Sequence, residues 1–189
     1  RQMITEGPSG KALVYALAVM EVNNAMGTIC AAPTAGSAGI IPGSLLAVAD
    51  KLDLKDEELI KGLFAAGGIG LVVANRATFA GDVAGCQAEC GVASAMAAAM
   101  LVELSGGTVL LAEQAASVAL QNTIGLICDP VAGLVEVPCF GRNSMGVSNA
   151  FAAADMVLGG YQALIPFDEV IDEMFEVGKN MRYENLCTT

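Results

Sequence analysis

Two apolar segments rich in alanine and glycine constrain the fold of this 189-residue chain most strongly. GLFAAGGIGLVVA (62–74) ends at Asn75-Arg76, and VASAMAAAMLV (92–102) ends at Glu103. A helix needs about 20 consecutive apolar residues to cross a bilayer, and both segments are shorter. Small side chains let helices approach closely in a soluble core. The two segments therefore predict buried helices and account for a mean hydropathy of +0.59.

The rest of the chain also shows helical signals and no convincing strand alternation. Pro42 suits the first turn of a short helix. Asp56 and Thr108 are expected to cap two further helices, and Asp168 begins the last one. No linker or repeat interrupts the pattern. The sequence predicts an all-α single domain over residues 1–189, with helices near 11–26, 41–50, 56–78, 86–104, 108–121, 144–160 and 168–180.

Charge and targeting signals narrow the function classes. The net charge is −11 with only nine scattered Lys and Arg, which argues against nucleic acid because phosphate binding needs clustered basic residues. Many acidic residues lie in 51–61 and 167–176, where they read as solvated helix faces. The chain shows no signal-peptide pattern. We expect a cytoplasmic protein that binds neither nucleic acid nor membrane.

Six cysteines occur in a chain that has no histidine. Disulfides are typical of small secreted scaffolds, which this alanine-rich chain does not resemble. Structural zinc favours two close Cys or His pairs, and Cys86 and Cys90 form the single close pair. Free cysteines often pack as small hydrophobes, and we expect this of Cys30. The full set is Cys30, Cys86, Cys90, Cys128, Cys139 and Cys187.

An iron–sulfur cluster is compatible with thiolate ligands alone. Cys86 begins a predicted helix, whose N-terminal N–H groups favour a thiolate. Cys128 and Cys139 are expected on a loop bent by Pro130, Gly133 and Pro138, so that both thiolates can converge. Cys90 lies one helical turn after Cys86 on the same face and competes with it as a ligand. Spacing alone does not separate the two.

Several motifs in order resemble one enzyme family. GPSGKA stands at 7–12, APTAGSAGIIPG at 32–43, GCQAECG at 85–91 and ICDPVAGLVEVPCFGRN at 127–143. Together they resemble the alpha chain of the iron–sulfur-dependent bacterial L-serine dehydratases over essentially the whole sequence. Alpha chains of this family normally carry a further stretch before this point. The resemblance also implies a beta chain or beta-like domain as a partner.

The resemblance implies a [4Fe-4S] cluster held by Cys86, Cys128 and Cys139. Three thiolates leave one iron open, and an open iron is a Lewis acid for the serine hydroxyl. The implied reaction converts L-serine to pyruvate and ammonia without net redox change. Cys187, near the end of the chain, is a hypothetical displaceable fourth ligand; an ordinary exposed thiol is the alternative.

Substrate contacts are expected in the glycine-containing motif at 32–43. Its successive backbone N–H groups can form a nest for a carboxylate, although a tight turn between helices has the same pattern. Asn143 is placed to meet substrate or cluster, and Lys11 is a candidate for contact with substrate or for a loop cap. Arg142 reads as a surface charge, a partner of Glu136 or a further contact. The expected carboxylate contacts are Thr34, Gly36, Ser37, Ala38 and Gly39.

The base that removes the Cα proton stays unassigned in the sequence. Without histidine, the candidates are a lysine, a thiolate and four acidic side chains, and a general base is chosen by geometry first. The base can also come from a preceding segment or a partner chain, in which case the 189 residues alone are inactive. The acidic candidates are Glu21, Glu89, Glu103 and Glu113.

Three other classes remain open. A pyridoxal-phosphate dehydratase performs the same reaction through a Schiff-base lysine but usually has an α/β fold. A structural module can bind zinc or a cluster without turning over serine. A membrane helical bundle would require detergent. A surface rich in Ala, Gly and Met predicts a homo- or hetero-oligomer.

Overall fold

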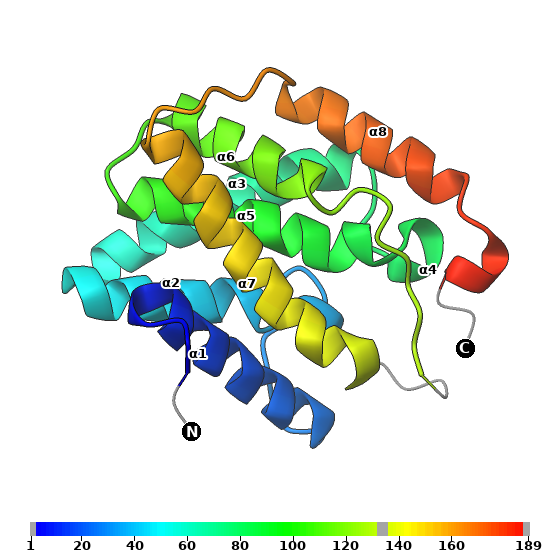
Figure 1. The fold of residues 1–189 in the computed structure, drawn as a ribbon, viewed down its shortest axis with the longest axis horizontal. Helices are drawn as coiled ribbons and strands as arrows, with labels where there is room; N and C mark the ends of the chain where they lie inside the picture. The colour runs from blue at the N-terminus through cyan, green and yellow to red at the C-terminus, as the bar shows by residue number, and fades with distance from the viewer. Residues whose placement is uncertain (1–2, 132–135, 187–189) are drawn as a thin grey trace.

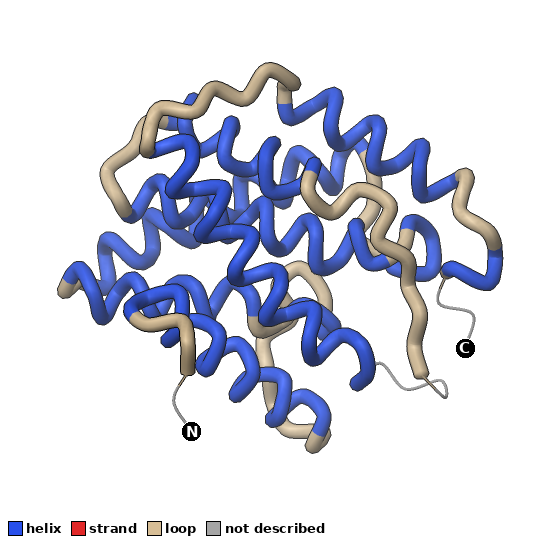
Figure 2. Tube along the Cα trace, in the orientation of Figure 1, coloured by secondary structure: helices blue, strands red, loops and turns tan. Residues whose placement is uncertain are grey.

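The computed structural model describes residues 3–131 and 136–186, and none of these residues lies in a β-strand (Figure 2). A π-helical turn, η2 (Gln87–Gly91), leads into α5, and two 3-10 turns are η1 (Ala35–Ser37) and η3 (Tyr183–Asn185). The all-α prediction is confirmed. The α-helices are α1 (Gly7–Asn24), α2 (Ile40–Leu52), α3 (Asp56–Arg76), α4 (Gly81–Ala84), α5 (Val92–Leu104), α6 (Val109–Gln121), α7 (Glu136–Leu158) and α8 (Phe167–Lys179).

Helix α5 forms the centre of the bundle (Figure 1). Every residue of α5 except Glu103 is buried, and the helix packs against α2, α3, α6 and α7. A helix that is apolar on all sides must be covered on all sides. Its alanines keep the side chains short, so the surrounding helices can approach closely. The apolar segment at 92–102 is therefore the buried helix that its composition predicts.

Two of the expected helix caps have different outcomes. Thr108 caps α6, because its Oγ1 accepts a hydrogen bond from the N–H of Leu111 at 3.3 Å. Asp56 does not cap α3, and that prediction is wrong: Lys55 is the N-cap residue and Asp56 the first helical one. The carboxylate of Glu58 accepts the Lys55 N–H at 3.0 Å, so the third residue of the helix does part of the capping.

The second cysteine segment also differs from its prediction. Cys139 lies in the first turn of α7 rather than in a loop. Val137 has non-helical angles (φ −119°, ψ 122°), so the regular helix begins at Pro138. The ring of a proline fixes φ near the helical value and suits this first position. Gly133, also expected to bend this segment, lies outside the described residues.

The segment after α6 runs down beside α4 and the end of the described chain (Figure 1). Within it, the backbone N–H of Cys128 donates to the carbonyl of Asn185 in η3 at 2.8 Å. Cys128 therefore lies in a loop, as the sequence predicts. Among the described residues, no helix combines the length and hydropathy that crossing a bilayer requires.

Helix α3 carries an exposed apolar face. Phe64 is 76% exposed and Leu71 is 65% exposed, although both lie in the apolar segment 62–74. Behind them, α3, α5, α6 and α8 enclose a groove of about 590 Å³ lined mainly by apolar side chains. The prediction of a fully buried helix therefore holds for α5 and only for one side of α3.

Candidate functional site

Cys86 and Cys139, two of the predicted ligand cysteines, are in contact in the structure. Cys86 directly precedes η2, Cys139 lies in the first turn of α7, and both are buried. The thiols of Cys139 and Cys90 hydrogen-bond to the sulfur of Cys86. Cys90, the expected competitor of Cys86, is thus in contact with it. We call Cys86, Cys90 and Cys139 the thiol group.

Within the thiol group, Cys86 is the acceptor. Hydrogen bonds from Cys139 and Cys90 lower the pKa of the Cys86 thiol to about 3, and the positive charge of Arg142 acts in the same direction against the effect of burial. Donating to Cys86, together with burial, raises the pKa of the Cys139 and Cys90 thiols. Within the thiol group, negative charge is therefore best stabilised on Cys86. Sulfur donors without imidazole are the set that iron–sulfur clusters use.

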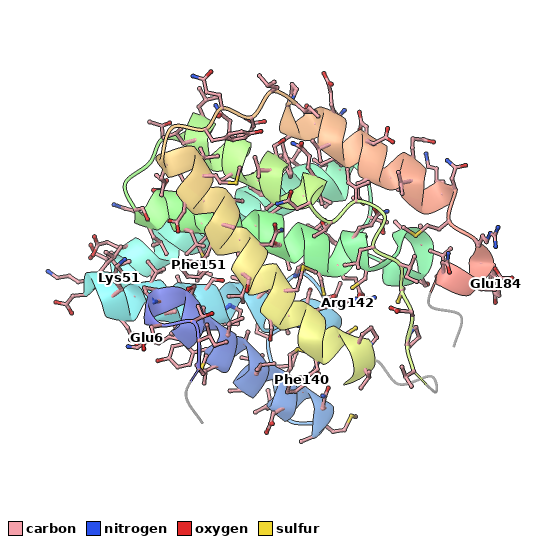
Figure 3. The ribbon with its side chains drawn as sticks, in the orientation of Figure 1. Glu6, Lys51, Phe140, Arg142, Phe151 and Glu184 are labelled. Atoms are coloured by element: carbon pink, nitrogen blue, oxygen red, sulfur yellow. The ribbon has the colours of Figure 1, made fainter. Side chains whose placement is uncertain are left out.

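Arg142 on α7, labelled in Figure 3, links the Cys128 loop to the thiol group. Its Nη1 donates to the carbonyl of Ile127 at 3.0 Å, and its Nη2 forms an ion pair with Asp129. The same side chain hydrogen-bonds to Cys86. One guanidinium thus contacts the residues on both sides of Cys128. Because only 13% of the side chain is exposed, Arg142 is not the surface charge that was one interpretation of its sequence position.

Gln87 is a buried polar residue that the sequence analysis did not identify. Its Nε2 donates to the carbonyl of Met174 in α8 at 2.8 Å, and its Oε1 accepts the N–H of Gly125 at 2.8 Å. Its backbone N–H donates to Leu126 at 3.1 Å. Gln87 therefore fixes the start of the loop that carries Cys128, directly beside Cys86. The available signal in the sequence is a glutamine directly after Cys86 in a mainly apolar stretch, which indicates a buried amide with hydrogen-bond partners.

The loop at 32–39 has a compact internal hydrogen-bond network. Thr34 Oγ1 and Ser37 Oγ lie 3.1 Å apart, and the N–H of Thr34 donates to Ser37 Oγ at 3.4 Å. The N–H groups of Ser37 and Ala38 donate to carbonyls inside the loop, as expected for the 3-10 turn η1. Gly36, Ser37, Ala38 and Gly39 are buried, and Thr34 is half-buried. This network uses several N–H groups of the expected nest, so carboxylate binding there stays a prediction.

Asn143 fastens this loop to α7. It is fully buried, and its Nδ2 donates to the carbonyls of Gly36 and Cys139, both at 2.8 Å. Its Oδ1 accepts the N–H of Gly39 at 3.0 Å. The amide therefore holds the loop against the first turn that carries Cys139. These bonds describe a positioning role, and direct contact with substrate stays a prediction.

Lys11 is not brought to this site. Its Nζ lies 3.5 Å from the carboxylate of Asp50, which also accepts a hydrogen bond from Tyr15 at 2.9 Å. Asp50 lies near the C-terminal end of α2, whereas the loop at 32–39 precedes its N-terminal end. Lys11 therefore pairs α1 with α2 on the surface.

Among the acidic base candidates, Glu89 is the one beside the thiol group. Burial raises the pKa of its carboxyl to about 7, and the charge of Cys86 adds to this effect. The hydroxyl of Thr34 donates to the same carboxylate. Glu113 accepts the N–H of Phe167 at 2.7 Å and Glu103 lies beside a groove near α3, so both are elsewhere. Glu21 is exposed on α1.

The donor set also bears on which metal centre is compatible. In the described part of the chain, no three Cys, Asp or Glu side chains are arranged around a single metal ion. In a [4Fe-4S] cluster each thiolate binds a different iron, so its ligands do not converge on one point. Buried thiols on three segments are compatible with such a cluster. Cys187, the hypothetical fourth ligand, lies outside the described residues.

Comparison with known proteins gives this arrangement of helices and buried thiols a family. The family described as "Serine dehydratase alpha chain" matches residues 1–189. The chain belongs to this family. The resemblance seen in the cysteine motifs is confirmed.

Individual relatives agree with this assignment. The chain is 57% identical over 170 residues to the probable L-serine dehydratase, alpha chain, of Bacillus subtilis. The aligned region covers 90% of this chain and 57% of the relative. The chain is 53% identical over 171 residues to the L-serine dehydratase, alpha chain, of Peptoniphilus asaccharolyticus, covering 90% and 59%. It is 43% identical to L-serine dehydratase TdcG of Escherichia coli, covering 89% and 37%. The chain therefore spans less than two thirds of the length of these relatives.

Proposed function

We propose that this chain carries the iron–sulfur site of an L-serine dehydratase and that the complete protein converts L-serine to pyruvate and ammonia. The observation that carries the proposal is the buried thiol group of Cys86, Cys90 and Cys139, to which Arg142 ties the Cys128 loop. The names of the relatives support the substrate. Their designation as alpha chains supports a beta chain or beta-like domain as the partner.

Cys86, Cys128 and Cys139 would hold the cluster, with Cys90 in contact with Cys86. A [4Fe-4S] cluster with three protein thiolates supplies a Lewis acid that stabilises the negative charge on a departing hydroxide. Arg142 supplies positive charge next to the thiolates, which offsets their mutual repulsion. This role needs a side chain that stays charged, because a neutral side chain would leave the repulsion between the thiolates uncompensated.

The chain's own residues shape the rest of the site. Asn143 holds the loop at 32–39 in position, and Gln87 holds the Cys128 loop, in both cases through hydrogen bonds of a buried amide. Both amides are fully buried, and water does not compete for these bonds. The loop at 32–39 then lies beside the thiol group, where it can bind the serine carboxylate. Holding substrate in one orientation lowers the entropic part of the barrier.

The reaction balances without an external oxidant or reductant. The Cα proton and the β-hydroxyl of serine leave together as water, which gives 2-aminoacrylate. This enamine takes up a proton at its β-carbon to become the imine. Water then hydrolyses the imine to pyruvate and ammonia. No electron is gained or lost overall, in keeping with a metal centre that acts as an acid.

The test compares single cysteine variants in the full-length protein with its partner chain, purified without oxygen. Three quantities are measured together: iron and sulfide content, absorbance at about 400 nm, and pyruvate formation from L-serine. We expect Cys86→Ser, Cys128→Ser and Cys139→Ser to lose both cluster and activity. Cys30→Ser is the matched control, because Cys30 lies outside the thiol group and is exposed, so the expectation that it packs as a buried small hydrophobe is wrong.

Different outcomes separate the competing classes. Iron binding without pyruvate formation in the wild type would favour a structural cluster module. Activity abolished by hydroxylamine in an iron-free protein would favour pyridoxal phosphate. Full cluster content in all three cysteine variants would contradict the proposed ligand set.

A further inference from the structure

Glu89 occupies the space between three parts of the site. It lies in η2, three residues after Cys86, and its side chain packs over the first residue of α4. A Cβ atom added at Gly81 would come within 3.1 Å of the Glu89 carboxyl carbon. The Gly81 N–H and the Thr34 hydroxyl both donate to the carboxylate. The carboxylate therefore lies close to α4, the loop at 32–39 and Cys86.

No cationic partner for this carboxylate is present in the described ranges. Glu89 takes part in none of the ion pairs there, and its nearest charges, Cys86 and Asp82, are both negative. It is nevertheless only partly exposed to solvent. A carboxylate removed from water is costly unless a cation or hydrogen bonds compensate it. Two donors supply part of that compensation, and the charge is left unbalanced.

An amino-acid substrate has the charge that this position lacks. The hydroxyl, carboxylate and ammonium of serine are attached to adjacent carbons, so the groups that bind them must be close neighbours. Thr34 belongs to the expected carboxylate loop and contacts Glu89 directly. Cys86 marks the proposed centre for the hydroxyl and also acts on Glu89 as a neighbouring charge. An acidic group adjacent to both is where the third substituent would bind.

We propose that Glu89 binds the α-ammonium group of the substrate and so makes the site selective for amino acids over acids that lack the amine. This inference rests on the proposed function, because it places the ammonium relative to the carboxylate loop and the thiol group. Charge-assisted hydrogen bonds to an ammonium are short and stronger than neutral ones. Thr34 and Gly81 act as positioning residues that aim the carboxylate.

The experiment uses two ligands that differ only in the ammonium and cannot be dehydrated. L-Alanine carries the carboxylate and the ammonium, and propanoate carries the carboxylate alone. Their affinities for the anaerobically purified full-length protein with its partner chain are measured by calorimetry or by inhibition of serine turnover. We expect the wild type to prefer L-alanine and Glu89→Gln to lose that preference at least about tenfold, as for one charged hydrogen bond.

Two control variants make the outcome specific. Glu173→Gln removes an exposed acid on α8 and should leave the preference unchanged. Glu89→Asp keeps the charge and should retain part of the preference, which a loss of folding would not do. Circular dichroism checks that Glu89→Gln folds. If it does not, Thr34→Val, which removes one donor that aims the carboxylate, should weaken the preference for L-alanine in the same direction.

The outcomes distinguish failure of this inference from failure of the proposed function. Unchanged preference in Glu89→Gln, in a wild-type protein that turns over serine, overturns the inference alone. A loss of serine turnover with the L-alanine preference intact would make Glu89 a general base, and would also overturn it. A wild type that neither turns over serine nor binds L-alanine contradicts the proposed function itself.

Discussion

The turn η2 and helix α5 follow one another in the chain, yet different forces hold them. Helix α5 is surrounded by apolar side chains, and burial of small hydrophobic residues keeps it in place. The turn η2 and the residue before it are held by polar contacts over long sequence distances. Gln87 reaches Met174 and Gly125, and Cys86 meets Cys139 and Arg142. The stability of the core thus depends on the volume of buried apolar side chains, whereas the geometry of the site depends on individual hydrogen bonds.

This difference predicts that the two regions respond differently to substitution. Loss of volume in α5 should reduce stability and leave a folded, intact site. Loss of one amide in η2 should reduce stability and displace a cysteine segment as well. Four substitutions test this contrast.

Gln87→Leu should have the largest effect, because it alone is expected to remove the iron as well as stability. The substitution removes the hydrogen bonds of the buried amide to the carbonyl of Met174 and to the N–H of Gly125, and each lost bond costs about 0.5–1.5 kcal/mol. We expect a loss of roughly 1–3 kcal/mol in unfolding free energy and a loss of iron from the folded protein. Urea denaturation and iron content measure the two effects.

The control for this substitution is Gln121→Leu. Gln121 donates one hydrogen bond, to Ser117 at 2.9 Å, and is only partly buried. Its loss should cost about 1 kcal/mol without change in iron content. If Gln87→Leu kept its full iron content, the amide would not position the Cys128 loop.

Met100→Ala should destabilise the core and spare the site. Met100 is fully buried in α5, and truncation of a buried methionine to alanine costs about 2–5 kcal/mol. Iron per folded molecule and the Michaelis constant for serine should stay at their wild-type values. An altered Michaelis constant in this variant would mean that the core and the site are mechanically coupled.

Glu89→Gln should change how stability depends on pH in the substrate-free protein. Burial raises the pKa of Glu89 to about 7 from 4.5. Between these values the unfolded chain has released a proton that the folded protein retains, so the carboxyl makes stability fall as pH rises. Relative to wild type, the variant should gain about 1–3 kcal/mol between pH 5 and pH 8.

Denaturation curves at both pH values give this difference directly. A difference between Glu89→Gln and wild type that did not vary with pH would mean that the carboxyl is as well solvated in the folded protein as in the unfolded chain.

Phe64→Ser should have the smallest effect on the chain itself. Phe64 is 76% exposed on α3, and substitutions at exposed positions usually stay within about 0.5 kcal/mol. The unfolding free energy of the isolated chain measures it. A loss well above 1 kcal/mol would show that another protein surface covers this face of α3 in solution.

The helices could be predicted from the sequence because their signals are local. The composition of 92–102 predicts α5, and Thr108 predicts the start of α6. Cys139 was wrongly expected in a loop, because Pro138 was read as a bend although proline also suits a first helical turn. A local pattern with two structural meanings is resolved only by its tertiary surroundings.

The polar contacts of the site could not be predicted in the same way. The partner of Gln87 in α8 is 87 residues away, and the partner of Asn143 at Gly36 is 107 residues away. No periodicity or cap motif links such positions. The cysteine motifs indicated which residues matter, and the fold was needed to show that Arg142 contacts both Cys86 and the Cys128 loop.

The central claim is that Cys86, Cys128 and Cys139 hold a four-iron cluster with one iron available to serine. Mössbauer spectroscopy of the iron-57-enriched, anaerobically purified protein tests it most directly, with and without L-serine. We expect four irons per chain, of which one changes its Mössbauer signal when serine binds while the other three do not. An iron-free active enzyme, or four irons that are all insensitive to serine, would contradict it.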